Sequence, residues 1–193
     1  GDIVEVLYQQ PSSGEPIIYA ARLRLSPESS KEHTVVAWRY QAPGDAYASY
    51  WTTEGKELSR RLIDGPIDSY EQIAVLLKDR PEHKGMDFKV NIGTEVHTPR
   101  AGVVTRLDWD LVGNGKSVEI RYQDGTLARF THLNEAMVKE GQKISAGTTI
   151  GKSGNTGRSP APHLHYELEK SGQIIDPVNY HGTLQRELQA SAL

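Results

Sequence analysis

The stretch "PHLHYELEK", residues 162–170, sets His163 and His165 two positions apart in a run of alternating apolar and polar side chains. Such alternation is typical of a β-strand, so both imidazoles project from one face of the strand. Leu164, Tyr166 and Leu168 point to the other face. This spacing suits a metal site, although an H-x-H in a strand is a solvated or core feature about as often. If the two histidines belong to a metal site, their face of the strand must form a cleft within the fold.

Two further stretches carry candidate ligands. In "EHKGMDFKV", residues 82–90, His83 and Asp87 are four apart, and Gly85 with the alternating residues after it favours a turn that enters a strand. In "RFTHLN", residues 129–134, His132 is expected to end the strand that follows the hairpin turn at Asp124-Gly125. A catalytic zinc site needs three protein ligands and one open position. Taken singly, each of these residues also fits an ordinary surface position.

Composition narrows the function further. The chain has 193 residues, 37% of them hydrophobic, with 18 Gly, 10 Pro, no Cys and a net charge of −3. The absence of Cys excludes a thiol nucleophile and leaves His and carboxylates as metal ligands. The sequence has no stripe of basic residues of the kind that binds nucleic acid. It also has no apolar run that reaches the ~20 residues of a membrane span. The chain begins at Gly1 without Met or an export signal, so we expect a processed piece.

The fold is predicted to be mainly β, because short β-branched and aromatic runs alternate with turn residues. Asp124-Gly125 predicts a hairpin turn with positive φ at both central positions. A helix is expected over 69–79, with Asp68 and Glu71 in a capping-box spacing. The domains are therefore predicted as a small N-terminal β domain (1–62), a helical connector (63–80), a second β domain (81–181) and a C-terminal tail (182–193), which forms a weak helix or frays.

The motifs "HKGMD", "THL" and "HLHYE", in this order, resemble the lysostaphin/LytM-type family of peptidoglycan metalloendopeptidases. The stretch "VKEGQKISAGTTIGKSGNTGRS" joins the last two motifs. "IGTEVHTPRAGVV" is similar to the family's Gly-x-x-Val-x-x-Pro-x-x-Gly-x-Val run, and "IIDPVNY" closes the match, which covers about 82–180. The resemblance implies an antiparallel β-sheet peptidase fold over this range.

The same resemblance implies the site. His83, Asp87 and His165 would hold Zn²⁺, while His132 and His163 would face the substrate as catalytic residues. The expected function is a zinc-dependent endopeptidase in which a zinc-activated water hydrolyses peptide cross-links of bacterial peptidoglycan. The stem peptides of peptidoglycan are the expected partner. Gly151, Gly154 and Gly157 are expected at tight turns or close-packed backbone.

Two departures from the family concern the substrate groove. The family's Ser-x-Phe-Gly-x-Arg run is replaced by "SYEQIAVLLKDRPEH", and Pro160-Ala161 occupies positions that more usually contain Gly. We therefore expect an altered groove wall and a stiffer loop beside the site. These changes bear on specificity more than on activity.

The first half, "WRYQAPGDAYASYWTTEGKEL", resembles more loosely the small β domain of Gram-negative cross-link hydrolases. This resemblance implies that the bond cleaved lies between D-Ala and diaminopimelate, and cleavage of glycine bridges is the alternative. The implied location is the periplasm or cell envelope, or outside the cell after secretion. Tyr47, Tyr50 and Trp51 would contact substrate or, more often at such spacing, fill a core. A non-catalytic module of the same family and a lipoyl- or biotinyl-type carrier are the competing readings. Here all five site positions are filled, and no modifiable Lys stands at a suitable hairpin tip.

Overall fold

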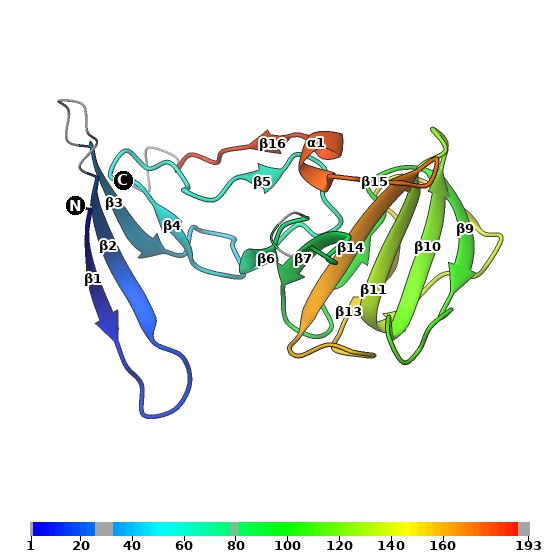
Figure 1. Cartoon of the computed structure of the whole chain (residues 1–193), viewed down its shortest axis with the longest axis horizontal. Coiled ribbons are helices and arrows are strands. Elements are labelled where there is room, and N and C mark those ends of the chain that lie inside the picture. Colours follow the sequence, from blue (N-terminus) through cyan, green and yellow to red (C-terminus); the bar gives the residue numbers. More distant parts are fainter. Residues whose placement is uncertain (1, 26–32, 78, 80, 189–193) are drawn as a thin grey trace. The chain divides into compact units, whose positions relative to one another are not determined.

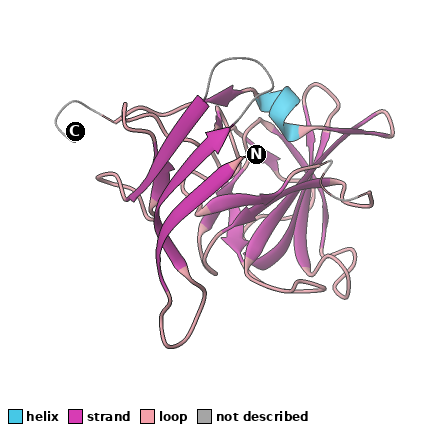
Figure 2. Cartoon of the chain, turned by 60° about the vertical axis from the view of Figure 1, so that its left-hand side comes forward, coloured by secondary structure: helices cyan, strands magenta, loops and turns pink. Residues whose placement is uncertain are grey.

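The computed structural model describes residues 2–25, 33–77, 79 and 81–188. Regular structure there is almost entirely antiparallel β-sheet, and α1 (Pro177–His181) is the single α-helix of the described ranges (Figure 2). The predicted mainly β fold is confirmed. In the part of the chain described, no helix has the length and apolar character needed to cross a membrane. The chain divides into unit 1, Gly1–Arg61 with Leu184–Leu193, and unit 2, Leu62–Thr183.

Unit 1 is built on a four-stranded antiparallel sheet in the order β1-β2-β3-β4. Its strands are β1 (Ile3–Gln9), β2 (Ile17–Leu25), β3 (His33–Tyr40) and β4 (Ser49–Trp51). Trp51 is only 3% exposed, and its indole N–H donates a hydrogen bond to the carbonyl oxygen of Tyr40 at 3.1 Å. For this aromatic residue, the core interpretation is the correct one. Two short strands, β5 (Arg61–Leu62) and β16 (Thr183–Leu184), form a separate pair.

A buried carboxylate ties three distant segments of unit 1 together. Glu57 is fully buried and accepts hydrogen bonds from Arg61 at 2.8 Å and Arg186 at 2.7 Å, and Arg186 also binds both carboxylate oxygens of Asp45 at 2.8 Å. Burial opposes the ionisation of Glu57, but the hydrogen bonds from Arg186 and Arg61 lower its pKa to about 2. Glu57 is therefore ionised in the folded chain at any ordinary pH.

Replacing Glu57 with Gln is expected to destabilise unit 1 by about 3 kcal/mol at pH 7, because each pKa unit corresponds to about 1.4 kcal/mol. The folded pKa lies below the ordinary value of 4.5, so this stabilisation is present above about pH 4.5 and is lost as the pH falls toward 2. Urea unfolding followed by tryptophan fluorescence between pH 7 and pH 2 measures both effects. The exposed Glu54→Gln is the control; equal stability of Glu57→Gln and wild type would contradict the assignment.

Unit 2 contains one large sheet in the order β12-β9-β10-β11-β14-β7-β6, whose central strands lie side by side in Figure 1. β13 pairs with β11 and β8, and β15 pairs with β14. The strand bounds are β6 (Gln72–Val75), β7 (Gly85–Lys89), β8 (Glu95–His97), β9 (Gly102–Leu107), β10 (Lys116–Tyr122), β11 (Leu127–Ala136), β12 (Lys143–Ile144), β13 (Thr149–Ser153), β14 (His163–Lys170) and β15 (Gln173–Ile175).

The two faces of this sheet differ in polarity, as the alternation in β14 predicts. Leu164, Tyr166 and Leu168 are fully buried on one face, together with Phe130 of β11 and Phe88 of β7. Burying each such side chain contributes roughly 1.5–3 kcal/mol. This face is the hydrophobic core. The polar residues of β14 therefore project to the opposite face, where the candidate site lies.

The helix predicted over 69–79 is wrong, and with it the helical nature of the connector. Gln72–Val75 form β6, where Ile73 lies opposite Phe88 of β7. Tyr70 is buried and packs edge-on against Phe88, with ring centroids 5.0 Å apart. Glu71 does not cap a helix but pairs with Lys89 at 3.2 Å. Pairing with the open edge of β7 overrides the local helical spacing.

Two smaller expectations also change. The hairpin at Asp124-Gly125 is confirmed between β10 and β11, but its turn differs, because only Gly125 has positive φ (86°) and its N–H bonds to the carbonyl of Tyr122. This is a three-residue loop with glycine in the left-handed position. The tail over 182–188 neither forms a helix nor frays, since it contributes β16 and a bridge between Lys56 and Glu187. Residues 189–193 lie outside the described residues.

Candidate metal centre

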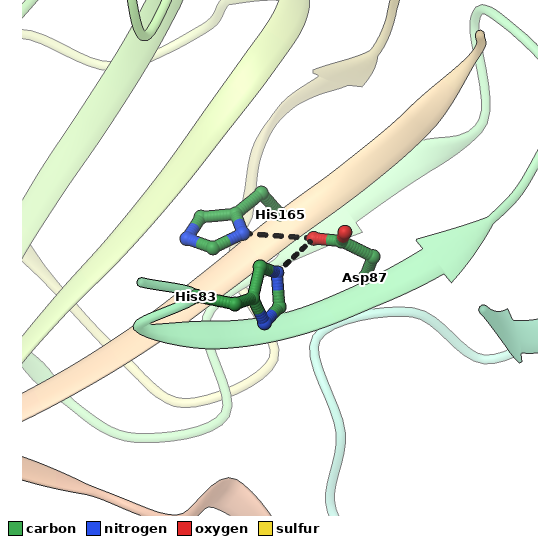
Figure 3. Close-up of side chains that lie close together, drawn as sticks. All are labelled: His83, Asp87 and His165. Carbon is green, nitrogen blue, oxygen red and sulfur yellow. Dashed lines mark hydrogen bonds and ion pairs between the residues drawn. The ribbon is translucent and has the colours of Figure 1, made fainter. Parts of the chain in front are cut away.

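The pairing of β7 with β14 brings three candidate metal ligands together. Asp87 lies directly opposite His165 in this antiparallel pair, and His83 lies two residues before the start of β7. Asp87 Oδ1 lies 2.8 Å from His165 Nδ1 and 3.0 Å from His83 Nε2, as drawn in Figure 3. One ligand atom from each residue lies within 4.8 Å of the others. Two residues 78 positions apart in sequence thus share one site.

The donor set fits a tetrahedral zinc ion. Zinc takes imidazole nitrogen and carboxylate oxygen at about 2.0–2.2 Å, which places two ligand atoms a little over 3 Å apart. Both ring nitrogens of His83 are buried, and neither makes a well-aligned hydrogen bond with the described residues, although Nε2 lies 3.0 Å from Asp87 Oδ1 as an ion-pair contact. Buried polar atoms normally have partners, so a metal ion on His83 Nε2 accounts for one of the two. Three protein ligands leave one coordination position open.

Gly85 is required by this arrangement. A Cβ at residue 85 would overlap the carbonyl oxygen of Tyr166 and lie 2.9 Å from Cε1 of the His165 ring. Any larger residue would push β7 away from β14, or turn the imidazole of His165. The glycine between His83 and Asp87 thus serves strand pairing inside the site.

The charges of the site favour an ionised carboxylate. Burial by itself raises the pKa of Asp87, but the hydrogen bond and charge of His165 lower it to about 2, with a further contribution from His83. For His165, burial lowers the pKa, whereas the hydrogen bond to Asp87 and the nearby carboxylate of Glu167 raise it to about 9. In the metal-free protein a proton therefore occupies the position between these side chains, and a bound cation replaces it.

The two predicted catalytic histidines lie beside the ligands with fixed ring orientations. His132 Nδ1 is 2.9 Å from the carbonyl oxygen of Thr156, and His163 Nδ1 is 2.8 Å from that of Ala161. A carbonyl oxygen only accepts, so each Nδ1 carries a proton, and each neutral ring keeps its lone pair on Nε2. The two ring centroids are 4.7 Å apart. Both Nε2 atoms are thus available to exchange protons with a bound substrate or water.

The backbone at His132 is strained. Its φ is +61°, in the left-handed region that a residue with a Cβ rarely adopts, and its N–H donates to the carbonyl of Asn114 at 2.8 Å. Such strain costs about 1–3 kcal/mol and is concentrated at functional sites. The prediction that His132 ends its strand is wrong, since it lies within β11, where this backbone conformation turns the imidazole toward the predicted metal ligands.

The five residues line one cavity of about 490 Å³. Its walls also include Ala74 and Val75 of β6, Gly113 and Asn114 of the loop before β10, and the 158–162 segment. β6 thus stands in the wall for which a helix was expected. The prediction that Pro160-Ala161 lie beside the site is confirmed.

The glycines of the "GKSGNTG" stretch have the predicted roles. A Cβ on Gly151 or Gly154 would meet backbone atoms of β11. Gly157 has φ +71° and packs directly against the backbone of Gly115, where a Cβ has no space. The two loops beside the cavity therefore pack closely here, and hydrogen bonds from Lys116 N–H to Thr156 Oγ1 and from Arg158 N–H to the carbonyl of Gly113 join them as well.

All five predicted site residues come together, but sequence reasoning missed the groups that hold them. The carbonyls of Thr156 and Ala161 orient the two predicted catalytic histidines, and backbone groups carry no signal in the amino-acid pattern. For Glu167 the sequence does carry a signal, because this residue follows His165 by two positions and so shares its face of β14.

Residues 81–177, about half of the chain, match the family model for Peptidase family M23. The chain belongs to peptidase family M23. M23 enzymes are zinc metallopeptidases, which agrees with the His-Asp-His set and with the predicted cofactor. The predicted lysostaphin/LytM-type resemblance is confirmed. The roles of the five individual side chains remain predictions.

Among its relatives, the M23 chain is 32% identical to "Peptidoglycan DD-endopeptidase ShyA" of Vibrio cholerae over 188 residues, which are 93% of this chain and 42% of ShyA. A zinc-containing peptidase from Vibrio cholerae has a similar structure, with TM-score 0.55 and 25% identity over 91% of this chain and 56% of that one. Lysostaphin from Staphylococcus simulans gives TM-score 0.54 and 32% identity over 56% and 48%. The chain thus spans less than half of ShyA.

Proposed function

We propose that this M23 chain is a zinc-dependent endopeptidase that hydrolyses peptide cross-links of bacterial peptidoglycan, in the cell envelope. The observation that carries the proposal is the convergence of His83, Asp87 and His165 in a cavity that two further histidines share. The names of the relatives support the substrate, since ShyA is a peptidoglycan DD-endopeptidase.

Each side chain has a defined part. Zinc held by His83, Asp87 and His165 would polarise the scissile carbonyl group and activate a water molecule for attack. His132 and His163 present Nε2 to the cavity, so that one accepts the proton of the attacking water and the other, once protonated, hydrogen-bonds the developing oxyanion. The carbonyl groups of Thr156 and Ala161 keep both rings in this orientation throughout.

Within this class we propose the bond between D-Ala and diaminopimelate. The exposed Arg158 lines the cavity, and within the described part of the chain no hydrogen bond or ion pair engages its guanidinium group. Diaminopimelate has a free carboxylate next to the scissile amide, whereas the interior of a glycine bridge has none. A guanidinium group binds a carboxylate in a two-pronged, charge-assisted manner.

Metal removal tests the proposed activity. The purified chain is incubated with peptidoglycan cross-linked through diaminopimelate, with and without a chelator, and the muropeptides are identified by mass spectrometry. Cross-linked dimers should become monomers, the chelator should stop this, and added zinc should restore it. Peptidoglycan with glycine bridges serves as the comparison substrate. Stoichiometric zinc without cleavage of either material would instead indicate a binding module.

A further inference from the structure

A row of alternating charges crosses four strands of unit 2 and ends beside the zinc ligands. Arg106 of β9 lies opposite Glu119 of β10, which lies opposite Arg129 of β11, which lies opposite Glu167 of β14. Side chains directly opposite each other share one face of a sheet. Glu167 follows His165 by two residues in β14, so the row occupies the face that carries the metal site.

The contacts along the row are close, and its centre is buried. Glu119 is 3% exposed and accepts hydrogen bonds from Arg106 at 2.6 Å and Arg129 at 2.8 Å. Arg129 also binds Glu167 through a short ion pair and Glu169 at 2.9 Å. With both neighbours charged and hydrogen-bonded, the guanidinium of Arg129 has little freedom to move. It therefore fixes the carboxylate of Glu167 in one place.

That place is next to the imidazole of His165. Oε2 of Glu167 lies 3.8 Å from His165 Nε2, while His165 Nδ1 faces Asp87 Oδ1 at 2.8 Å. The ring therefore stands between two carboxylates, one on the metal side and one on the side of the charge row. If Nδ1 binds the metal, the proton of the neutral ring is on Nε2, which points to Glu167.

We propose that Glu167, held by Arg129, is a positioning residue for the zinc ligand His165. This inference rests on the proposed function, because it assigns a role toward the same metal. The negative charge of Glu167, 3.8 Å from Nε2, favours the tautomer that carries the proton on Nε2, which leaves Nδ1 free to bind zinc and makes it a stronger donor. Arg129 keeps the carboxylate of Glu167 off the metal, so that a single carboxylate, that of Asp87, remains in the ligand set.

The test is a zinc affinity measurement, by competition of the metal-free protein against a chromophoric chelator. Glu167→Gln should weaken zinc binding about 10- to 100-fold, the usual loss when such a partner of a ligand histidine is removed. Glu167→Asp retains the charge opposite Arg129 but withdraws the carboxylate from His165, so it should also weaken binding. Glu169→Gln is the matched control, because it removes a carboxylate from the same arginine and the same strand face; its zinc affinity should equal that of wild type.

Thermal unfolding of the metal-free variants separates positioning from a structural role. A Glu167→Gln protein that unfolds at lower temperature yet binds zinc as tightly as wild type would overturn the proposal and leave the charge row as a support for the sheet. Equal losses in Glu167→Gln and Glu169→Gln would also overturn it. In both cases wild type retains its zinc and its hydrolytic activity, so the proposed function stands. Failure of wild type to bind zinc would remove both.

Discussion

Replacing His83 or Asp87 with alanine is expected to abolish both zinc retention and hydrolysis of peptidoglycan cross-links. Each substitution leaves two of the three proposed ligands, and Asp87 contributes the only carboxylate of the set. Without Asp87, the imidazoles of His83 and His165 also lose the acceptor that now lies 3.0 and 2.8 Å away. Metal content by atomic emission after gel filtration, together with muropeptide analysis, measures both consequences.

His97→Ala provides a matched control for this experiment. His97 belongs to unit 2 and is bonded through Nε2 to the carbonyl oxygen of Gly65 at 2.9 Å, away from the proposed ligand set. The His97 variant should keep one zinc ion per chain and its turnover. Retention of full zinc stoichiometry by His83→Ala or Asp87→Ala would exclude the substituted residue as a ligand. Circular dichroism shows whether any loss of metal comes from unfolding.

His132→Ala is expected to keep zinc and to lose turnover by about 10²- to 10⁴-fold, the usual range for a group that transfers a proton in the transition state. His132 supplies no ligand atom to the His83, Asp87 and His165 set. Its ring lies against that of His163, with Nε2 free because Nδ1 is tied to Thr156. The substitution removes this nitrogen and leaves the metal ligands in place.

The zinc content and the rate of dimer cleavage must be measured on the same preparation of the His132 variant. The expected result is one zinc ion per chain with a strongly reduced kcat. Undiminished hydrolysis would remove His132 from the mechanism. Loss of zinc along with activity would show that His132 holds the metal site together, in contrast to the role assigned to it here.

The clustering of the predicted metal ligands could be anticipated from the sequence because it depends on short-range spacing. In a strand, two residues of separation put His163 and His165 on one face, and this holds whatever the strand pairs with. The order of the motifs then identified the family. The placement of His83 and Asp87 beside His165 needs only that β7 and β14 be neighbours, which the family resemblance implied.

The errors arise where long-range pairing decides. Tyr70, Ile73 and Leu77 have helical spacing, but Ile73 pairs with Phe88 in a strand, and the free edge of β7 is invisible in a local pattern. The same holds for the link between Glu167 and Arg129, which are 38 residues apart and meet through the register of β11 and β14. The pairing of Ile73 with Phe88 and the contact of Arg129 with Glu167 both depend on strand register, which is set by many residues of the sheet together.

The contact between Gly115 and Gly157 bears on how new substrate preferences can arise in this scaffold. Because backbone packs on backbone there, neither loop can lengthen or swing outward without displacing the other. A change in the length of either loop, which is a common way to alter substrate recognition, would therefore disrupt the contact between Gly115 and Gly157. Diversification is left to the exchange of cavity-lining side chains such as Arg158.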